Sequence, residues 1–335
     1  MTVRRGGPVG LALLAVLALA VLIVAVSVGA SPLGFRDLLS ILAGHGDASS
    51  RAILLDVRLA RVLLAGVVGA ALASAGAAYQ AVLRNPLADP FILGVSGGAA
   101  LGATIFVAVS PTSAIGSPLG RPLAAFLGAV ATLVVLFGLA RFRGRTATTA
   151  LLLTGVVLNA FDSAIIQFFV TAGDPARFQG TLAYLMGAMG SPPWGALASV
   201  AALTAIGVGI LGANAHTLNL LSLGAEEAGQ LGVPVERSTW VVVLAASLIT
   251  AAAVAFTGIV GFVGLIVPHA MRAVFGPDHR ALLPACAIAG AATVAAADAA
   301  ARTLLAPVEL PVGVITAVIG GPFFLVLLLR RLRAS

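Results

Sequence analysis

The sequence contains no lysine: all 19 basic residues of this 335-residue chain are arginine. A Walker A loop holds the β- and γ-phosphates of ATP through Gly-Lys-Ser/Thr, so the chain cannot form one. If the protein depends on ATP, another subunit must hydrolyse it. There is also a single cysteine, Cys286, which excludes an internal disulfide. It lies in an apolar run, and we expect it to be a small core residue.

Charge is scarce as well. Only 9% of the residues are charged and 60% are hydrophobic, with a mean hydropathy of +1.11, whereas a soluble domain carries about 25% charge. The composition therefore predicts an all-α polytopic membrane protein. The net charge of +7 comes from arginines scattered between apolar segments. Because they form no basic face, nucleic acid is excluded as a partner.

A membrane helix needs about 20 mostly apolar residues, and the chain has about ten such segments, some of them short or interrupted. The predicted spans are 8–29, 58–83, 91–109, 121–140, 148–171, 194–212, 236–256, 259–275, 282–303 and 310–329. The first span follows Arg4 and Arg5, as a signal peptide would. Its apolar run from Pro8 to Val28 is longer than a signal sequence needs and no clear cleavage site follows, so we expect a retained helix.

An even number of spans puts both termini on one side of the membrane. With the termini in the cytoplasm, most arginines lie inside, including Arg141, Arg143 and Arg145 and the terminal cluster Arg330, Arg331 and Arg333. The positive-inside rule therefore predicts cytoplasmic termini. Within the second span, small residues recur every three or four positions, which predicts close helix packing. These are Gly66, Gly69, Ala73 and Gly76.

The two-proline turn, residues 84–90, interrupts the apolar pattern with the sequence Arg-Asn-Pro-Leu-Ala-Asp-Pro. Proline lacks a backbone donor and moves the preceding residue out of the helical region. Arg84 and Asp89 would each cost roughly 2.5–3.5 kcal/mol at the centre of a bilayer. We therefore expect this turn at a membrane surface or beside a wet path.

The coupling segment, residues 214–235, is too polar to span the membrane and separates the sixth predicted span from the seventh. Leu220, Leu221, Leu223 and Leu231 fit the apolar side of one or two short helices, which Gly224 and Gly232 would break. The orientation predicts that this segment lies in the cytoplasm. It is interpreted either as a docking element for a soluble partner or as a solvated connection.

Six motifs together give the chain a clear family resemblance. They are Arg58–Arg61, Gly76–Gln80, Arg84–Gly94, Leu218–Gly224, Gly261–His269 and Glu309–Gly313. With these, nearly the whole chain resembles permease subunits of the iron-chelate and vitamin B12 family of ABC importers, the FecCD or BtuC-like family. One departure is Ala60, where the family usually has proline.

The resemblance implies a type II importer permease in which residues 1–335 form one transmembrane domain, with a possible inverted repeat of spans 2–5 and 7–10. It implies a homodimer in the inner (cytoplasmic) membrane, two cytoplasmic ATPase subunits and an external substrate-binding protein. It also implies uptake of a large metal chelate (ferric siderophore, haem or cobalamin) by alternating access. The chain itself would be no enzyme and would bind no cofactor, since ATP and Mg would bind the ATPase. The chelate, and whether the permease dimer is homomeric, stay open.

The resemblance also assigns roles to particular residues. Arg58, Arg61 and Arg302 resemble the external arginines that meet acidic residues of the binding protein, although anchoring of helix ends is the alternative. The expected contacts with the ATPase come from the coupling segment: Leu223, Gly224, Glu226, Glu227, Leu231 and Gly232. The expected cytoplasmic gate consists of Asn85, Leu87, Thr148 and Thr149, where the two threonines have helix capping as an alternative role.

Three polar residues within the spans stay candidates. Gln80 and Asp162 are possible pathway residues, while Asp298 lies four residues before Arg302 and is expected to form an ion pair with it. The competing hypothesis is an ion-coupled secondary transporter with Asp162 and Asp298 as carriers. No histidines have the spacing of a zinc motif, and no Gly-x-Ser-x-Gly elbow points to an intramembrane hydrolase.

Overall fold

The computed structural model describes residues 7–29, 34–45, 47–110, 117, 119–141 and 148–332, and every regular element in these ranges is helical. The long apolar helices are α1 (Pro8–Ser27), α4 (Ala60–Val82), α7 (Gly120–Arg141), α8 (Thr148–Ala172), α10 (Trp194–Ala213), α13 (Val235–Thr257) and α15 (His279–Thr303). Shorter apolar helices are α5 (Val95–Val109) and α14 (Val263–Phe275), and α16 (Val312–Leu332) is a further apolar helix. Connecting helices are α2 (Phe35–Leu42), α3 (Ala48–Ala52), η1 (Ile53–Leu59), η2 (Pro90–Leu93), α9 (Pro175–Leu185), α11 (Ala215–Leu221) and α12 (Ala225–Gln230).

Each of the ten predicted spans corresponds to one apolar helix of the structure. The differences lie at the ends. The second span is longer than predicted, because α3 and the π-helical η1 run directly into α4 to form one helix from Ala48 to Val82. The third is shorter, because Gly94 adopts a left-handed conformation and α5 begins only at Val95. The helices α2 and α9, which were not predicted, are amphipathic and too short to span the membrane.

The core forms around α4, which packs against α15, α13 and α14. Almost every residue of α4 is buried. Its small residues allow this: a Cβ added at Gly69 would overlap the backbone of Gly290 in α15, and one added at Gly76 would overlap the backbone of Gly264 in α14. The prediction of close helix packing along this stripe is confirmed.

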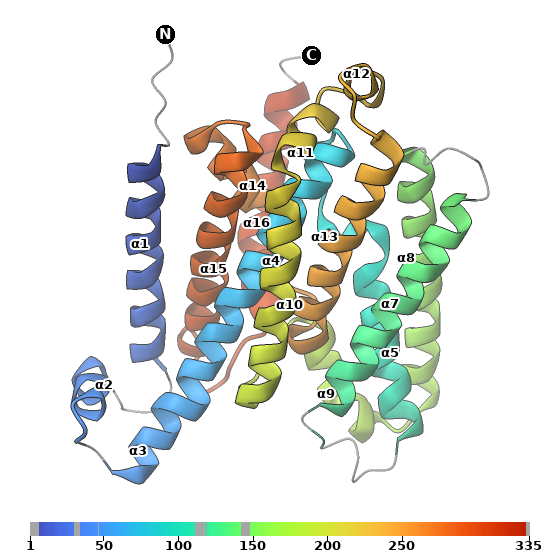
Figure 1. Cartoon of the computed structure of the whole chain (residues 1–335). Coiled ribbons are helices and arrows are strands. Elements are labelled where there is room, and N and C mark those ends of the chain that lie inside the picture. Colours follow the sequence, from blue (N-terminus) through green and yellow to red (C-terminus); the bar gives the residue numbers. More distant parts are fainter. Residues whose placement is uncertain are drawn as a thin grey trace.

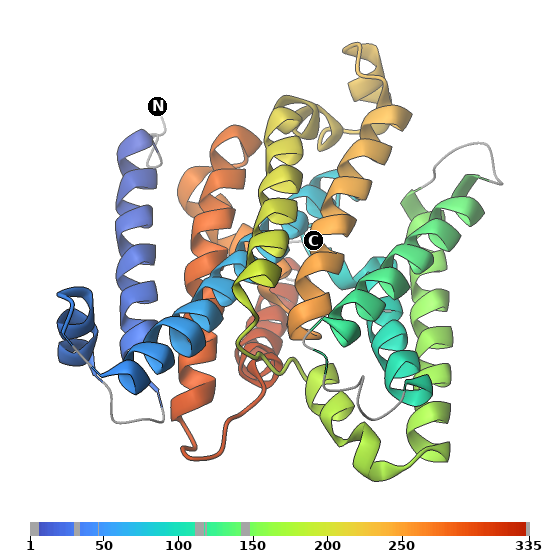
Figure 2. The same cartoon turned by 60° about the horizontal axis from the view of Figure 1, so that its bottom comes forward.

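The arrangement of the helices gives the bundle two distinct ends (Figure 1). The start of α1, the end of α16 and the short helices α11 and α12 lie at one end, which we call the α12 end. The helices α2, α3 and α9 lie at the opposite α3 end. Figure 2 shows α5, α7 and α8 gathered at one side of the molecule and α1 with α15 at the other, in agreement with their mutual contacts.

The two halves of the chain share an unusual backbone feature. Among the described residues, the non-glycine residues with positive φ are Arg84 (φ 48) and Phe262 (φ 66). Each lies between a long buried helix, α4 or α13, and a short helix, α5 or α14. Left-handed backbone is uncommon outside glycine. This shared position supports the inverted repeat, which stays a prediction.

Candidate functional site

The coupling segment forms two short helices that project at the α12 end (Figure 1). Gly224, with φ 151, separates α11 from α12, and Gly232, with φ 84, follows the end of α12. The two breaks that the sequence predicted are therefore confirmed. The carboxylate of Glu227 folds back over Gly224, occupying the space where a Cβ would point. Any other residue at Gly224 would be strained by this positive φ, and the Glu227 side chain would have to move aside.

The surface of this segment carries both acidic and apolar side chains. Glu226 and Glu227 are exposed in the first turn of α12, where carboxylates suit the helix dipole. Leu223 and Leu231 are also exposed, by 61% and 60% of their surface. Exposed leucines beside acidic groups on a projecting segment are typical of a docking element.

A side chain that the sequence analysis missed joins this segment to α15. The Asn219 amide nitrogen donates to Asp278 Oδ1 at 2.7 Å, and Asn219 Oδ1 accepts from the His279 backbone N–H at 2.8 Å and from His279 Nδ1 at 2.7 Å. Asp278 caps α15, and hydrogen bonds from the Arg280 backbone N–H and from Asn219 lower the pKa of its carboxyl below the ordinary value. The only signal in the sequence was the polar run before an apolar segment.

The two-proline turn closes the end of α4 and leads into η2. Asn85 Oδ1 accepts from the Leu87 backbone N–H at 3.0 Å, and Asp89 Oδ1 accepts from the Phe91 N–H at 3.0 Å. These side chains supply acceptors for the backbone N–H groups that are left free where the helix is interrupted. Both Asn85 and Leu87 are half-buried.

Gln80 bridges this turn to α14. Its amide nitrogen donates to Gly264 O at 3.2 Å and Ala88 O at 3.4 Å, while its Oε1 accepts from Arg272 at 3.0 Å. The residue is only 4% exposed. Contact with cargo stays a prediction, but these bonds favour a structural role for Gln80.

The other expected gate residues, Thr148 and Thr149, begin α8, and their side chains lie outside the part of the chain that the structure describes. Asp162 lies further along α8 and is buried against Gly97 of α5. Its Oδ2 has no hydrogen-bond partner among the described residues. The predicted pathway role of Asp162 stays a prediction.

A buried ionic cluster occupies the α3 end of the bundle. Asp298 Oδ1 accepts from Arg61 Nε and its Oδ2 from Arg302 Nε, both at 2.9 Å, and Arg61 also pairs with Glu309 at 2.8 Å. We call these four residues with Arg58 the arginine cluster. The expected Asp298–Arg302 ion pair is confirmed. What the sequence did not reveal is that Asp298 is shared with Arg61, which lies 237 residues away.

The arginines of this cluster are not displayed on the surface. Arg58, Arg61 and Arg302 are 4%, 9% and 4% exposed. Arg302 donates to Ala25 O and Val28 O, and Arg58 donates to Val26 O and Ser27 O, so both satisfy carbonyls at the C-terminal end of α1. Anchoring of a helix end, the alternative to docking, is therefore visible in the structure. Docking of a binding protein stays a prediction.

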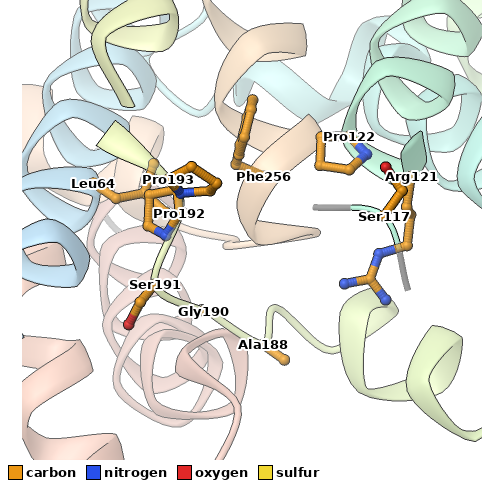
Figure 3. Close-up of a pocket in the computed structure, with 10 residues that line it drawn as sticks. All are labelled: Leu64, Ser117, Arg121, Pro122, Ala188, Gly190, Ser191, Pro192, Pro193 and Phe256. Carbon is orange, nitrogen blue, oxygen red and sulfur yellow. The ribbon is translucent and has the colours of Figure 1, made fainter. Parts of the chain in front are cut away.

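A small cavity opens at the α3 end between α4, α7, α13 and the segment before α10 (Figure 3). Leu64, Phe256 and several prolines line it, together with Arg121, whose guanidinium lies 5.1 Å from the centre of the Tyr184 ring. Its volume of about 260 Å³ lies below the roughly 300–1,000 Å³ of small-molecule sites. A large chelate does not fit inside it. No group of three metal-ligating side chains occurs among the residues described.

Comparison with known proteins agrees with this architecture. The model of the FecCD transport family matches residues 16–330. The cobalamin import system permease protein BtuC of Halobacterium salinarum is 42% identical over 84% of this chain and 75% of its own length. The hemin transport system permease protein HmuU of Yersinia pestis is 41% identical over 91% and 90%. A solved inward-facing transporter, assigned to the metal-chelate ABC type, superposes with a TM-score of 0.81 at 30% identity and covers 95% of this chain and 97% of its own.

Proposed function

Because the chain belongs to the FecCD transport family, in which it is a permease subunit of an ABC importer and not an enzyme, we propose that it imports a large metal chelate by alternating access. Ferric siderophore, haem and corrinoid are the candidate cargoes. Relatives named for cobalamin and for hemin support this class, as does the solved metal-chelate transporter. The near-equal identities of these two relatives do not separate cobalamin from hemin as the cargo.

The coupling segment is the observation that carries this proposal. An acidic and leucine-bearing projection, at the same end as the start of α1 and the end of α16, fits a surface that receives force from a soluble ATPase. Since the chain has no lysine for a P-loop, the ATP and Mg would be bound by that partner. We propose that Leu223, Gly224, Glu226, Glu227, Leu231 and Gly232 form this contact.

The full assembly would contain a second copy of this chain, two ATPase subunits and an external binding protein. All of residues 1–335 would act as one membrane domain with its α12 end in the cytoplasm of the cell, within the inner membrane. Asn85 and Leu87, with Thr148 and Thr149, would form the gate nearest the ATPase. At the α3 end, Arg58, Arg61 and Arg302 would face the binding protein, with the half-exposed Glu309 beside Arg61 at the accessible edge.

Uptake by proteoliposomes tests the proposal. We expect accumulation of labelled cyanocobalamin, hemin or ferrichrome only when the ATPase, ATP and the loaded binding protein are all present. Collapse of the proton gradient should leave the rate unchanged. Uptake that follows the gradient and needs no ATP would instead identify a secondary transporter.

The coupling surface has its own test. Reversing both charges, with Glu226→Lys and Glu227→Lys, should weaken binding of the ATPase at least tenfold, since like-charge contacts in an interface cost several kcal/mol. Glu236→Lys, an equally exposed glutamate in the first turn of α13, is the matched control. Equal ATPase affinity in all variants would remove Glu226 and Glu227 from the interface.

A further inference from the structure

We propose that Asn219 is the positioning residue through which movement of the coupling segment reaches α15 and, along it, the arginine cluster. This inference rests on the proposed function, because it identifies how force from the ATPase would cross the membrane in this chain.

Both the oxygen and the nitrogen of the Asn219 side-chain amide form hydrogen bonds to the start of α15. Its oxygen accepts two hydrogen bonds from His279 and its nitrogen donates to Asp278, all at 2.7–2.8 Å. His279 is only 3% exposed, so the two bonds to it are partly shielded from water, whereas the bond to Asp278 lies at the exposed surface. An amide held at both ends fixes position as well as distance, which is what transmission of a displacement requires.

Asn219 is also distinctive within its segment. The chain itself joins the coupling segment to α10 and α13, but α15 is reached only through space. Among the hydrogen bonds of the described residues, those of Asn219 are the only side-chain bonds from the segment to a span that does not adjoin it in the chain. Asn214, a second asparagine of the segment, bonds only to Ile210 O of the preceding helix turn.

The helix α15 connects the contact at Asn219 with the arginine cluster at the opposite end of the bundle. At 25 residues, α15 is about 37 Å long at 1.5 Å per residue and crosses the roughly 30 Å core of a bilayer. Asp298, in its last turns, holds Arg61 and Arg302. One helix therefore has the coupling segment at its first residue and the arginine cluster at its end.

Packing against α4 makes α15 act as part of a stiff unit. The two helices touch backbone to backbone where Gly69 meets Gly290, and the Arg61–Asp298 ion pair joins them again at the α3 end. Pro284 interrupts the hydrogen bonds of α15 in its second turn, but α4 runs alongside. A tilt imposed at His279 would thus shift the arginine cluster instead of being absorbed by bending.

A charge exchange across the contact at Asn219 provides the test. Asn219→Asp places two carboxylates face to face. Asn219→Asp with Asp278→Asn restores one donor and one acceptor between the two side chains and keeps the acceptor for His279, while it removes the Asp278 Oδ1 acceptor of the Arg280 backbone N–H. In the reconstituted complex we expect Asn219→Asp to reduce the stimulation of ATP hydrolysis by the loaded binding protein about tenfold, within the usual range of coupling between sites. Basal hydrolysis should stay within about twofold. The double variant should recover the stimulation, and the matched control Asn214→Asp should behave as wild type.

Three results would overturn the inference. One is normal stimulation in Asn219→Asp, another is loss that the exchange does not repair, and the third is loss of the assembled complex on size-exclusion chromatography, which would make Asn219 a residue of assembly. Failure of the proposed function is distinguishable, because then the wild-type complex itself would show no ATP-dependent uptake.

Discussion

Asp298 forms ion pairs with two arginines inside the membrane domain. Because these groups are buried, the effect of the Asp298 charge on stability is larger than it would be at the surface. A carboxylate that is fully buried between Arg61 and Arg302 compensates two guanidinium groups that are themselves largely buried. Such groups are costly once a partner is removed. The same arrangement opposes a role for Asp298 as an ion carrier, since both of its oxygens are already occupied.

Asp298→Ala should therefore reduce the free energy of unfolding by about 3–5 kcal/mol, the cost of breaking a buried ion pair. Glu309→Gln is the control, because the side chain of Glu309 is 47% exposed and surface pairs contribute at most about 1 kcal/mol. Unfolding in mild detergent measures both. Equal losses in the two variants would contradict the central position of Asp298.

Gln80→Leu separates a structural role from contact with cargo. Loss of the amide leaves Gly264 O without its donor and Arg272 without its acceptor, so we expect about 1–3 kcal/mol lower stability. The KM for cargo should not change. A raised KM at unchanged thermal stability would return Gln80 to the pathway.

At the scale of helices, the contact of α4 with α15 shows how small residues replace the hydrophobic effect within a membrane. Lipid is as apolar as leucine, so helices associate through close packing instead. Gly69 and Gly290 bring the two backbones together without intervening side chains. This contact between Gly69 and Gly290 fixes the position of α4 relative to α15.

Gly69→Val should separate α4 from α15 and lower stability by about 1–3 kcal/mol or more, as overpacking does. Gly209→Ala in α10 is the matched control: no atom lies within 4 Å of its added Cβ, and alanine favours a helix by up to about 1 kcal/mol over glycine. Melting temperatures in detergent will compare them. If Gly69→Val melts as wild type does, the two helices are not in backbone contact.

For the molecule as a whole, the two ends of the bundle should face opposite sides of the membrane. The α12 end carries the acidic coupling segment, and the α3 end carries the arginine cluster. The positive-inside rule predicts the orientation that has α12 in the cytoplasm.

Cysteine labelling tests this orientation in intact cells, starting from a Cys286→Ser background. Glu227→Cys in α12 should be protected from a membrane-impermeant maleimide until the cells are opened, while Ser49→Cys in α3 should react at once. Both parent residues are exposed. Wild-type Cys286 is the control and should stay unreactive, because it is fully buried. The reverse pattern would place the coupling segment outside and reject its docking to a cytoplasmic ATPase.

The sequence predicted much of the fold because membrane spans are encoded locally. Apolar length fixed the ten helices, and glycine fixed the breaks at Gly224 and Gly232. The candidate site was predicted only in part, since its contacts join distant segments. Asn219 and Asp278 are 59 residues apart, and Arg272 meets Gln80 across 192. No local sequence pattern indicates which residues this far apart in the chain come into contact.

By itself the sequence determined the class of protein, the number of spans and the need for a separate ATPase, because hydropathy and the absence of lysine are properties of composition and order. Only the tertiary structure decided what the polar side chains do. It showed that the three arginines expected to meet the binding protein are buried and that two of them hold the end of α1, gave Asp298 two partners and joined the coupling segment to α15. The physical reason is that a buried polar group must find its partner wherever packing brings one.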